Sequence, residues 1–232
     1  MKIAGFQKNS FIDYPGKMAA VIFTPGCNLN CYYCHNRSLI QGDSVKSFYH
    51  HDVVLDFLKK RSGFLDGVVI TGGEPTLQKG LEDFIRRIRG LGYAIKLDTN
   101  GTNPNMLQEL IKKGLLDYVA MDIKASQNRY EEICGTKVIW EDIYRSIQIL
   151  LKGDIEYEFR TTLAPDLTEQ DLLEMARMIQ GANLYALQQY RRPDTGAFWD
   201  DRLNKPSHTG EEIKRWAEKI SSLVKKCIVR GI

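Results

Sequence analysis

Three of the chain's five cysteines lie close together, in the stretch FTPGCNLNCYYCHN at residues 23–36. Cys27, Cys31 and Cys34 have the spacing C-x3-C-x2-C and directly follow the apolar run MAAVIFT. The Pro-Gly pair and the two asparagines beside them are typical of a loop, in which three thiols can converge. In a cytoplasmic protein thiols stay reduced, so this cluster indicates a metal site rather than disulfides.

Four kinds of site could use these thiols. A structural zinc site needs four ligands, and His35 is a poor fourth because it adjoins Cys34 in the chain. Covalent haem would match Cys31-Tyr-Tyr-Cys34-His35, and a thioredoxin-like pair would use Cys31 and Cys34, but both leave Cys27 without a role. An iron–sulfur cluster of the [4Fe–4S] type is normally held by four cysteines. Three cysteines would leave one iron open to another ligand.

The cysteine motif, with Tyr33 before its last member, resembles that of the radical S-adenosylmethionine superfamily. The resemblance implies that Cys27, Cys31 and Cys34 bind one [4Fe–4S] cluster, and that the methionine part of S-adenosylmethionine chelates the open iron. One electron would then cleave the sulfonium into methionine and a 5′-deoxyadenosyl radical. This chemistry belongs to the cofactor, so we expect no side chain to act as a catalytic acid or base.

A second motif, Gly72-Gly73-Glu74-Pro75, ends the apolar run GVVIT. A tight turn into a helix would explain the glycines by itself. The superfamily resemblance implies instead that this stretch binds the amino group of S-adenosylmethionine. Glycines permit close backbone approach, and carbonyl oxygens and Glu74 can accept hydrogen bonds from an ammonium group. The sequence contains neither the G-x-G-x-x-G fingerprint of dinucleotide-binding proteins nor the G-x4-G-K-[ST] phosphate loop. A site for a dinucleotide or a nucleoside triphosphate is therefore disfavoured.

Polar residues also follow the next three apolar runs, in KLDTNG, MDIK and EFRTT. By resemblance to glycyl-radical activating enzymes we expect them to line the cofactor. Lys124 is suited to bind a carboxylate of the cofactor, and Asp98 is suited to bind its ribose hydroxyls. Alternatively, Asp98, Thr99 and Asp122 together could hold a monovalent cation. Buried ion pairs would explain the same residues without a cofactor. The full set is Asp98, Thr99, Asn100, Asp122, Lys124 and Arg160.

Apolar β-rich runs alternate with amphipathic stretches along the chain. We predict strands at 18–24, 67–71, 93–98, 118–123, 155–162 and 183–190, and helices near 51–61, 79–91, 103–114, 140–152, 168–180 and 210–226. Six β-α units imply a parallel sheet with right-handed crossovers. Six are too few to close an eight-stranded barrel, so we expect an α/β fold, an open partial (β/α)6 barrel, with a doubly wound sheet as the alternative.

We expect one domain over 1–232, with a strand and turn at 1–17, the β-α core at 18–190, and a loop and helix at 191–232. The net charge of +3 gives no reason to expect nucleic acid as a partner. No apolar run reaches the ~20 residues of a membrane span, and the first 17 residues contain no secretory apolar segment. The sequence therefore predicts a cytoplasmic protein without a membrane partner.

The stretches SFIDYPGKMAAVIFTPGCNLNCYYCHN, FRTTLAP and CIVRGI resemble the activating proteins of anaerobic ribonucleoside-triphosphate reductase. This resemblance implies that the protein places a glycyl radical on the large subunit of that reductase. It also implies a low-potential electron donor of the flavodoxin or ferredoxin kind. Because a hydrogen atom rather than a proton is removed, no general base is required.

Three other interpretations remain open. The protein could be an activating enzyme of the pyruvate formate-lyase type, a radical enzyme acting on a small heterocycle, or an electron carrier. Some glycyl-radical activating enzymes carry extra cysteine clusters, whereas Cys134 and Cys227 are single here and far apart in the sequence. We therefore expect both to be ordinary thiols.

Overall fold

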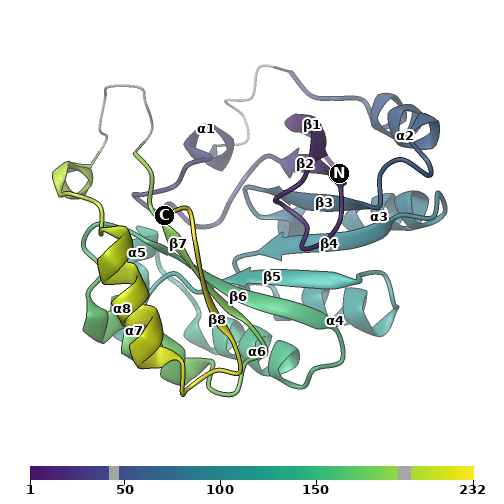
Figure 1. Cartoon of the computed structure of the whole chain (residues 1–232). Coiled ribbons are helices and arrows are strands. Elements are labelled where there is room, and N and C mark those ends of the chain that lie inside the picture. The colour runs from purple at the N-terminus through teal and green to yellow at the C-terminus, as the bar shows by residue number, and fades with distance from the viewer. Residues whose placement is uncertain (42–46, 193–199) are drawn as a thin grey trace.

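The computed structural model describes residues 1–41, 47–192 and 200–232. Within these ranges eight strands form one sheet, in the order in which they occur in the chain (Figure 1). β1 runs antiparallel to β2, and every later strand is parallel to its neighbours. The strands are β1 (Gly5–Ser10), β2 (Ala19–Thr24), β3 (Gly67–Gly72), β4 (Ala94–Thr99), β5 (Tyr118–Asp122), β6 (Glu156–Leu163), β7 (Tyr185–Gln189) and β8 (Cys227–Arg230).

Helices connect the parallel strands. They are α1 (Arg37–Ile40), α2 (His51–Lys60), α3 (Leu81–Arg89), α4 (Pro104–Lys112), α5 (Tyr130–Cys134), α6 (Trp140–Leu151), α7 (Glu169–Met178) and α8 (Gly210–Ile220). Capping boxes start two of them, since Thr168 and Thr209 each accept a backbone hydrogen bond from the third helical residue. None of the helices in the described ranges is both long and apolar enough to cross a membrane.

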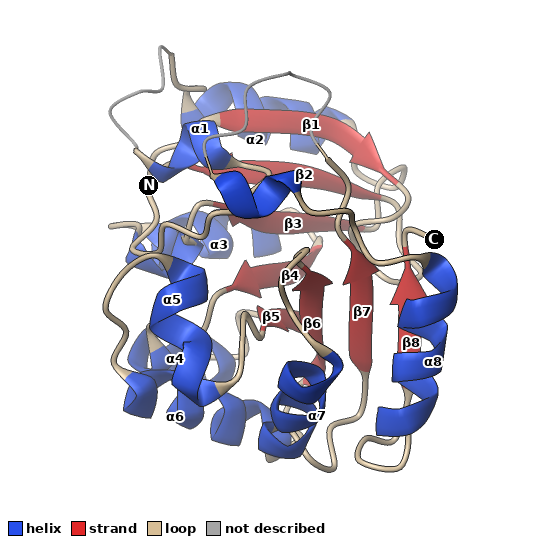
Figure 2. Cartoon of the chain, turned by 90° about the vertical axis from the view of Figure 1, so that its left-hand side faces the viewer, coloured by secondary structure: helices blue, strands red, loops and turns tan. Residues whose placement is uncertain are grey.

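The sequential strand order decides between the two predicted architectures. A doubly wound sheet needs a point at which the strand order reverses, and this sheet has none. The six predicted strands are present as β2 to β7, and the sheet is open between its edges β1 and β8. Figure 2 shows the strands turning from horizontal at β1–β3 to vertical at β6–β8. The prediction of an open α/β barrel-like fold is confirmed.

The C-terminal region differs from the prediction. The helix expected to reach residue 226 ends at Ile220, and the chain then forms β8. The turn after α8 is fixed by backbone hydrogen bonds from Gly181 to Leu223 and from Lys225 to Ala182, each 2.8 Å long. These bonds bring the end of the chain alongside β7. The short helices α1 and α5 were also not predicted, because four or five residues are too few to show a period.

The two faces of the sheet have different surroundings. Side chains such as Ile22, Ile70 and Leu97 point outward and form the main core with the helices. On the inner face the amino-terminal ends of the strands carry a small apolar cluster formed by Tyr14, Ala19, Val21 and Val69. Further along the same face, charged side chains alternate with the apolar outward ones, as the two-residue period of a strand requires. On this inner face the apolar cluster therefore lies at the amino-terminal ends of the strands, and the charged side chains lie nearer their carboxyl ends.

β8 is joined to the inner face by an ion pair. The guanidinium of Arg230 donates hydrogen bonds of 2.9 Å and 2.6 Å to the two carboxylate oxygens of Glu158 on β6. The Glu158 side chain is 1% exposed, and Tyr118 also donates to it at 3.3 Å. A buried carboxylate that loses its cation is costly. The last strand therefore supplies the charge that Glu158 requires.

We predict that Arg230→Ala lowers the free energy of unfolding by about 2 kcal/mol, because Glu158 then stays buried without a cation. Urea denaturation measures this change. Adding Glu158→Gln should recover part of the loss, since the amide carries no charge. The exposed Lys226→Ala, which removes a side chain from the preceding turn, should change the stability by less than about 0.5 kcal/mol. Equal losses in both single variants would contradict the role of the pair.

Candidate active site

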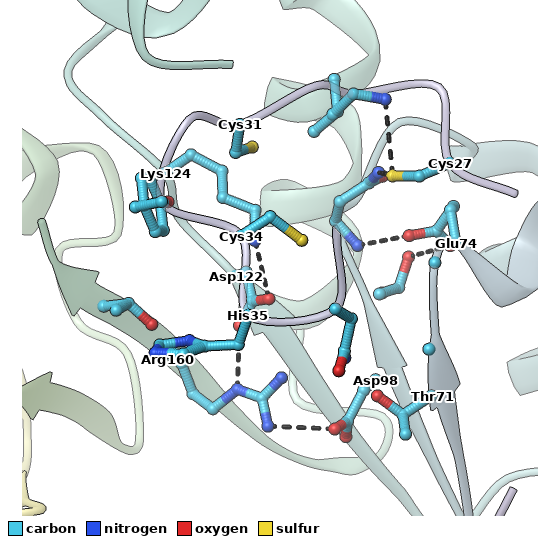
Figure 3. A pocket seen from close by; sticks show the side chains of 18 of the residues that line it. Cys27, Cys31, Cys34, His35, Thr71, Glu74, Asp98, Asp122, Lys124 and Arg160 are labelled. Carbon is cyan, nitrogen blue, oxygen red and sulfur yellow. Dashed lines mark hydrogen bonds and ion pairs between the residues drawn. The ribbon is translucent and has the colours of Figure 1, made fainter. Parts of the chain in front are cut away.

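A cavity of about 280 Å³ lies at the carboxyl ends of the parallel strands (Figure 3). The structure brings all the predicted site residues together in its lining. They are Cys27, Cys31, Tyr33, Cys34, Gly72, Gly73, Glu74, Asp98, Thr99, Asn100, Asp122, Lys124 and Arg160. Active sites of (β/α) barrels form at this end of the strands because the loops after all the strands meet there. Residues that are distant in the sequence therefore share one cavity.

The cysteine loop leaves the end of β2 and is held by backbone hydrogen bonds. Gly26 donates to Leu39 at 2.7 Å and Cys27 donates to Ile40 at 3.2 Å, so the loop returns beside its own start. Cys34 donates to the Cys31 carbonyl at 3.1 Å, which closes a turn between these two cysteines. Cys31 is buried, whereas Cys27 and Cys34 are half-buried. Their thiols face the cavity from one side (Figure 3).

Gly72 and Gly73 bind the backbone just before the first cysteine. Gly73 donates to the Thr24 carbonyl and Glu74 donates to the Gly26 carbonyl, both at 2.8 Å. Gly72 has φ of +118°, and a Cβ there would overlap the backbone of Thr24. A Cβ on Gly73 would lie 2.6 Å from the carbonyl carbon of Gly26 and closer still to its oxygen. Both positions therefore need glycine if the end of β3 is to contact the cysteine loop.

The carboxylate of Glu74 is fully buried and already bound by the protein. Oε1 accepts from the Thr76 amide at 3.1 Å, the Thr76 hydroxyl at 2.6 Å and the Thr99 hydroxyl at 2.8 Å, and Oε2 accepts from the Asn100 amide at 2.7 Å. Burial raises the pKa of Glu74, and these donors oppose that shift. The side chain therefore fixes the turn after β4 against the turn after β3.

Asn100 joins the turn after β4 to the cysteine loop. Its Nδ2 donates to Asn28 Oδ1 at 3.1 Å and to Cys27 Sγ at 3.7 Å, while its Oδ1 accepts from the Thr102 hydroxyl at 2.7 Å. Through this side chain and Glu74, three strand ends form one connected unit. Asn100 thus contacts the thiol of Cys27, the first cysteine of the motif.

Charged side chains form the inner wall of the cavity. Arg160 donates from Nε to Asp122 at 2.9 Å and from Nη1 to Asp98 at 3.1 Å. Lys124 pairs with Asp122 at 2.9 Å, and Lys96 pairs with Asp98 at 2.5 Å. Lys96 is 1% exposed, so its charge depends entirely on its partner. Of these wall residues, Asp98, Asp122, Lys124 and Arg160 line the cavity and Lys96 does not, and Glu74 is a further acidic residue of the lining.

The shifts in pKa follow from this pairing. Burial acts to raise the pKa of Asp122, but Arg160 and Lys124 outweigh it and hold the pKa well below its usual range. The pKa of Asp98 is lowered in the same way, against burial, by Arg160 and Lys96. Both carboxylates are therefore ionised and already neutralised by protein cations, and the Thr99 hydroxyl points to Glu74. The structure lends no support to a monovalent cation at Asp98, Thr99 and Asp122.

The chain was compared with known proteins, and the model of the radical SAM superfamily matches residues 21–179. This match covers more than half of the chain, including the cysteine loop and the charged wall. The chain belongs to the radical SAM superfamily.

Two relatives illustrate the range of radical SAM proteins that are similar to it. A Methanocaldococcus jannaschii protein named as a glycyl-radical enzyme activating enzyme is 34% identical, over 99% of this chain and 96% of its own. A Pyrococcus abyssi protein named as a GTP 3′,8-cyclase is 25% identical, over 86% of this chain and 66% of its own. The first relative matches along its whole length, whereas the second contains a further third that has no counterpart here.

A solved structure shows the same fold. The Streptococcus suis protein SuiB, in its structure with S-adenosylmethionine, superposes with a TM-score of 0.68 at 13% identity, over 91% of this chain and 52% of its own. At this identity the likeness concerns the fold alone.

Radical SAM proteins use a [4Fe–4S] cluster and S-adenosylmethionine, and the thiols of this site fit the cluster. No three His, Cys, Asp or Glu side chains in the described ranges are close enough to hold a single metal ion, whereas each cysteine of a cluster binds its own iron. Burial raises the pKa of Cys27 to about 11 and also raises that of Cys34. Cluster binding must therefore release protons from these thiols.

Several contacts of the site were not predicted. Lys96 and Glu158 precede Asp98 and Arg160 by two residues, so the period of a strand places each pair on one face. That signal was present in the sequence. His35, considered as a zinc ligand, instead has Nε2 at 2.8 Å from the Arg191 carbonyl and its ring 5.1 Å from that of Tyr190. It fixes the cysteine loop to the end of β7.

We predict that Gly73→Ala abolishes cluster binding, because the added methyl group displaces the backbone at Gly26 and with it Cys27. Iron and sulfide content after anaerobic reconstitution measures the loss. Gly90→Ala is the matched control, since its nearest contact would be 3.4 Å away and its φ of −60° suits alanine. A full complement of iron in Gly73→Ala would show that the close approach is not needed.

We predict that Asp122→Asn lowers the free energy of unfolding by about 2 kcal/mol at pH 7, because Lys124 loses its carboxylate. The pKa of Asp122 is lower in the folded state than its ordinary 3.8, so its contribution is complete above that value and declines as the pH falls below it. The difference between wild type and variant should therefore stay constant from pH 7 to about pH 4 and shrink as the pH falls from about 4 to about 2. Urea denaturation across this range measures it. Glu109→Gln, at an exposed pair with Lys113, should have little effect at any pH.

Proposed function

We propose that this protein places a glycyl radical on the large subunit of an anaerobic ribonucleoside-triphosphate reductase. The observation that carries the proposal is the relative named as a glycyl-radical enzyme activating enzyme, which matches over nearly the full length of both chains. The stretches SFIDYPGK and CIVRGI, which resemble the reductase-activating group, support the choice of partner. A reducing partner of the flavodoxin or ferredoxin kind completes the proposal.

The wall of the cavity supports hydrogen-atom rather than proton chemistry. Asp98 and Asp122 are paired with cations, and Glu74 is buried among four donors. A general base must be able to take up a proton near the working pH, and Asp98 and Asp122 do not because cations lower their pKa. The oxygens of Glu74 already accept from protein donors. Removal of a hydrogen atom from a glycine Cα needs no such group. Cys27, Cys31 and Cys34 would hold the [4Fe–4S] cluster, which would supply the electron needed to cleave S-adenosylmethionine.

The residues around the cavity receive binding roles in this proposal. Lys124 and Arg160 are cations that line the cavity, and a cation there favours a carboxylate such as that of the methionine part of the cofactor. Lys124 is the more exposed of the two, at 17% of its side chain, and is the proposed contact. The carbonyl groups near Gly72 and Gly73 are proposed to accept from the amino group, and Asp98 to contact the ribose.

A small-molecule substrate is the second candidate, because the GTP 3′,8-cyclase relative aligns over 86% of this chain. The relative named as an activating enzyme is more similar and matches over nearly the full length of both chains, which favours the activating function. A partner of the pyruvate formate-lyase type would use the same site and differs only in the protein that supplies the glycine.

We predict that the reconstituted, reduced protein cleaves S-adenosylmethionine to 5′-deoxyadenosine and methionine, and that adding an anaerobic reductase large subunit produces the doublet EPR signal of a glycyl radical. Chromatography and EPR spectroscopy measure the two steps. Cys34→Ala should show neither step, because a cluster ligand is lost. Cleavage without a doublet would exclude this partner and direct the search to pyruvate formate-lyase or a heterocycle. Intact cofactor after reduction would exclude radical generation altogether.

A further inference from the structure

Lys96 is a buried cation on the inner face of β4. It lies between Val69 on β3 and Tyr118 on β5. Val69 belongs to the apolar cluster of this face and Tyr118 packs against that cluster, so the lysine stem has apolar surroundings. The Lys96 side chain is 1% exposed and does not line the cavity, whereas Asp98 does. A charge in such a place is retained only where a partner compensates it.

The partner of Lys96 is the carboxylate of Asp98, two residues further along the strand. The ammonium Nζ lies 2.5 Å from Oδ1. The guanidinium of Arg160 donates from Nη1 to Oδ2 at 3.1 Å and also from Nε to Asp122 at 2.9 Å, so it is shared between two carboxylates (Figure 3). The neighbour of Asp98 on β5 is Ala120, whose methyl group offers no hydrogen bond. The direction of the Asp98 carboxylate therefore depends on Lys96.

The carboxylate of Asp98 has room for two further donors. An ionised carboxylate has about four positions that accept hydrogen bonds, two on each oxygen. In the part of the chain that the structure describes, Lys96 and Arg160 take one position on each oxygen. Burial acts to raise the pKa of Asp98, but these two cations outweigh it and lower the pKa, so the group is ionised and only accepts. One accepting position on each oxygen matches two hydroxyl groups on adjacent carbons, as in ribose.

We propose that Lys96 is a positioning residue for cofactor binding: with Arg160 it holds the Asp98 carboxylate so that both oxygens accept from the vicinal hydroxyls of the ribose. Lys96 does not touch the cofactor and acts through Asp98. Loss of the ammonium would leave Oδ1 without its cation and free the carboxylate to turn toward Arg160 alone. The inference rests on the ribose contact of the proposed function, and it does not depend on which partner receives the radical.

The test measures whether Lys96 and the ribose hydroxyls act together. Isothermal titration calorimetry of the anaerobically reconstituted protein gives the affinity for S-adenosylmethionine and for its 2′,3′-dideoxy analogue. Lys96→Met keeps an apolar stem without the ammonium and should weaken binding of S-adenosylmethionine about tenfold, the size expected when a hydrogen bond to a charged group is impaired. It should leave the affinity for the analogue unchanged. Lys113→Met, at an exposed pair with Glu109, is the matched control and should change neither affinity.

The two ligands separate positioning from packing. Equal weakening for both ligands in Lys96→Met would indicate packing alone and refute the proposal, and so would an unchanged affinity for S-adenosylmethionine. Equal affinity of the wild type for the two ligands would refute the ribose contact and the proposal with it. If Lys96→Met does not fold, Lys96→Gln, which keeps a polar side chain without the charge, replaces it in the comparison.

Chemical rescue supplies a second measurement. Lys96→Ala should regain affinity for S-adenosylmethionine in methylammonium chloride, because a small cation can take the place of the lost ammonium beside Asp98. Tetramethylammonium chloride at the same ionic strength has no N–H donor and should not restore binding. Equal effects of the two salts would contradict the role of the ammonium group. Because binding precedes any radical transfer, these results are independent of a failure to activate a reductase.

Discussion

The site depends on the close contact between the end of β3 and the loop that carries the cysteines. Two backbone hydrogen bonds, from Gly73 and Glu74, place the start of that loop, and side chains at Gly72 or Gly73 would occupy the same space as its backbone. A loop rich in glycine and asparagine has many conformations in isolation, and ordering it costs free energy. Fixing its first residues reduces that cost for the three thiols together. The glycine pair therefore acts on the cluster through the backbone, whatever further contact it makes with a cofactor.

Glu74 extends this constraint to the neighbouring strand. A buried carboxylate is tolerated only where donors surround it, and here Thr76, Thr99 and Asn100 supply them. Because Asn100 also donates to Cys27 Sγ, the end of β4 is connected to the first thiol of the cysteine motif. The cysteine loop, the turn after β3 and the turn after β4 are thus joined by hydrogen bonds, although they are far apart in the sequence. The charged wall beneath them is built by the same rule, with each buried cation placed next to a carboxylate.

The sequence predicts most of this architecture because its signals are local. Apolar runs mark β2 to β7, and the residues after them meet at one edge because parallel strands share a direction. β8 was not predicted, because its four half-buried residues show no clear alternation of apolar and polar side chains. Its position is set by the turn that follows α8. The direction of the Glu74 side chain and the hydrogen bond from the Asn30 amide to the Cys134 carbonyl depend on packing between distant segments. No spacing in the sequence encodes them.

The pairing of the wall also explains how one superfamily includes different reactions. Carboxylates that are held by cations take no part in proton transfer, so the cavity offers binding and exclusion of water rather than acid–base chemistry. These groups can then stay the same while the molecule that loses a hydrogen atom differs. Selection of that molecule must arise at the rim, where Gln188 and Gln189 at the end of β7 and His35 in the cysteine loop line the outer part of the cavity.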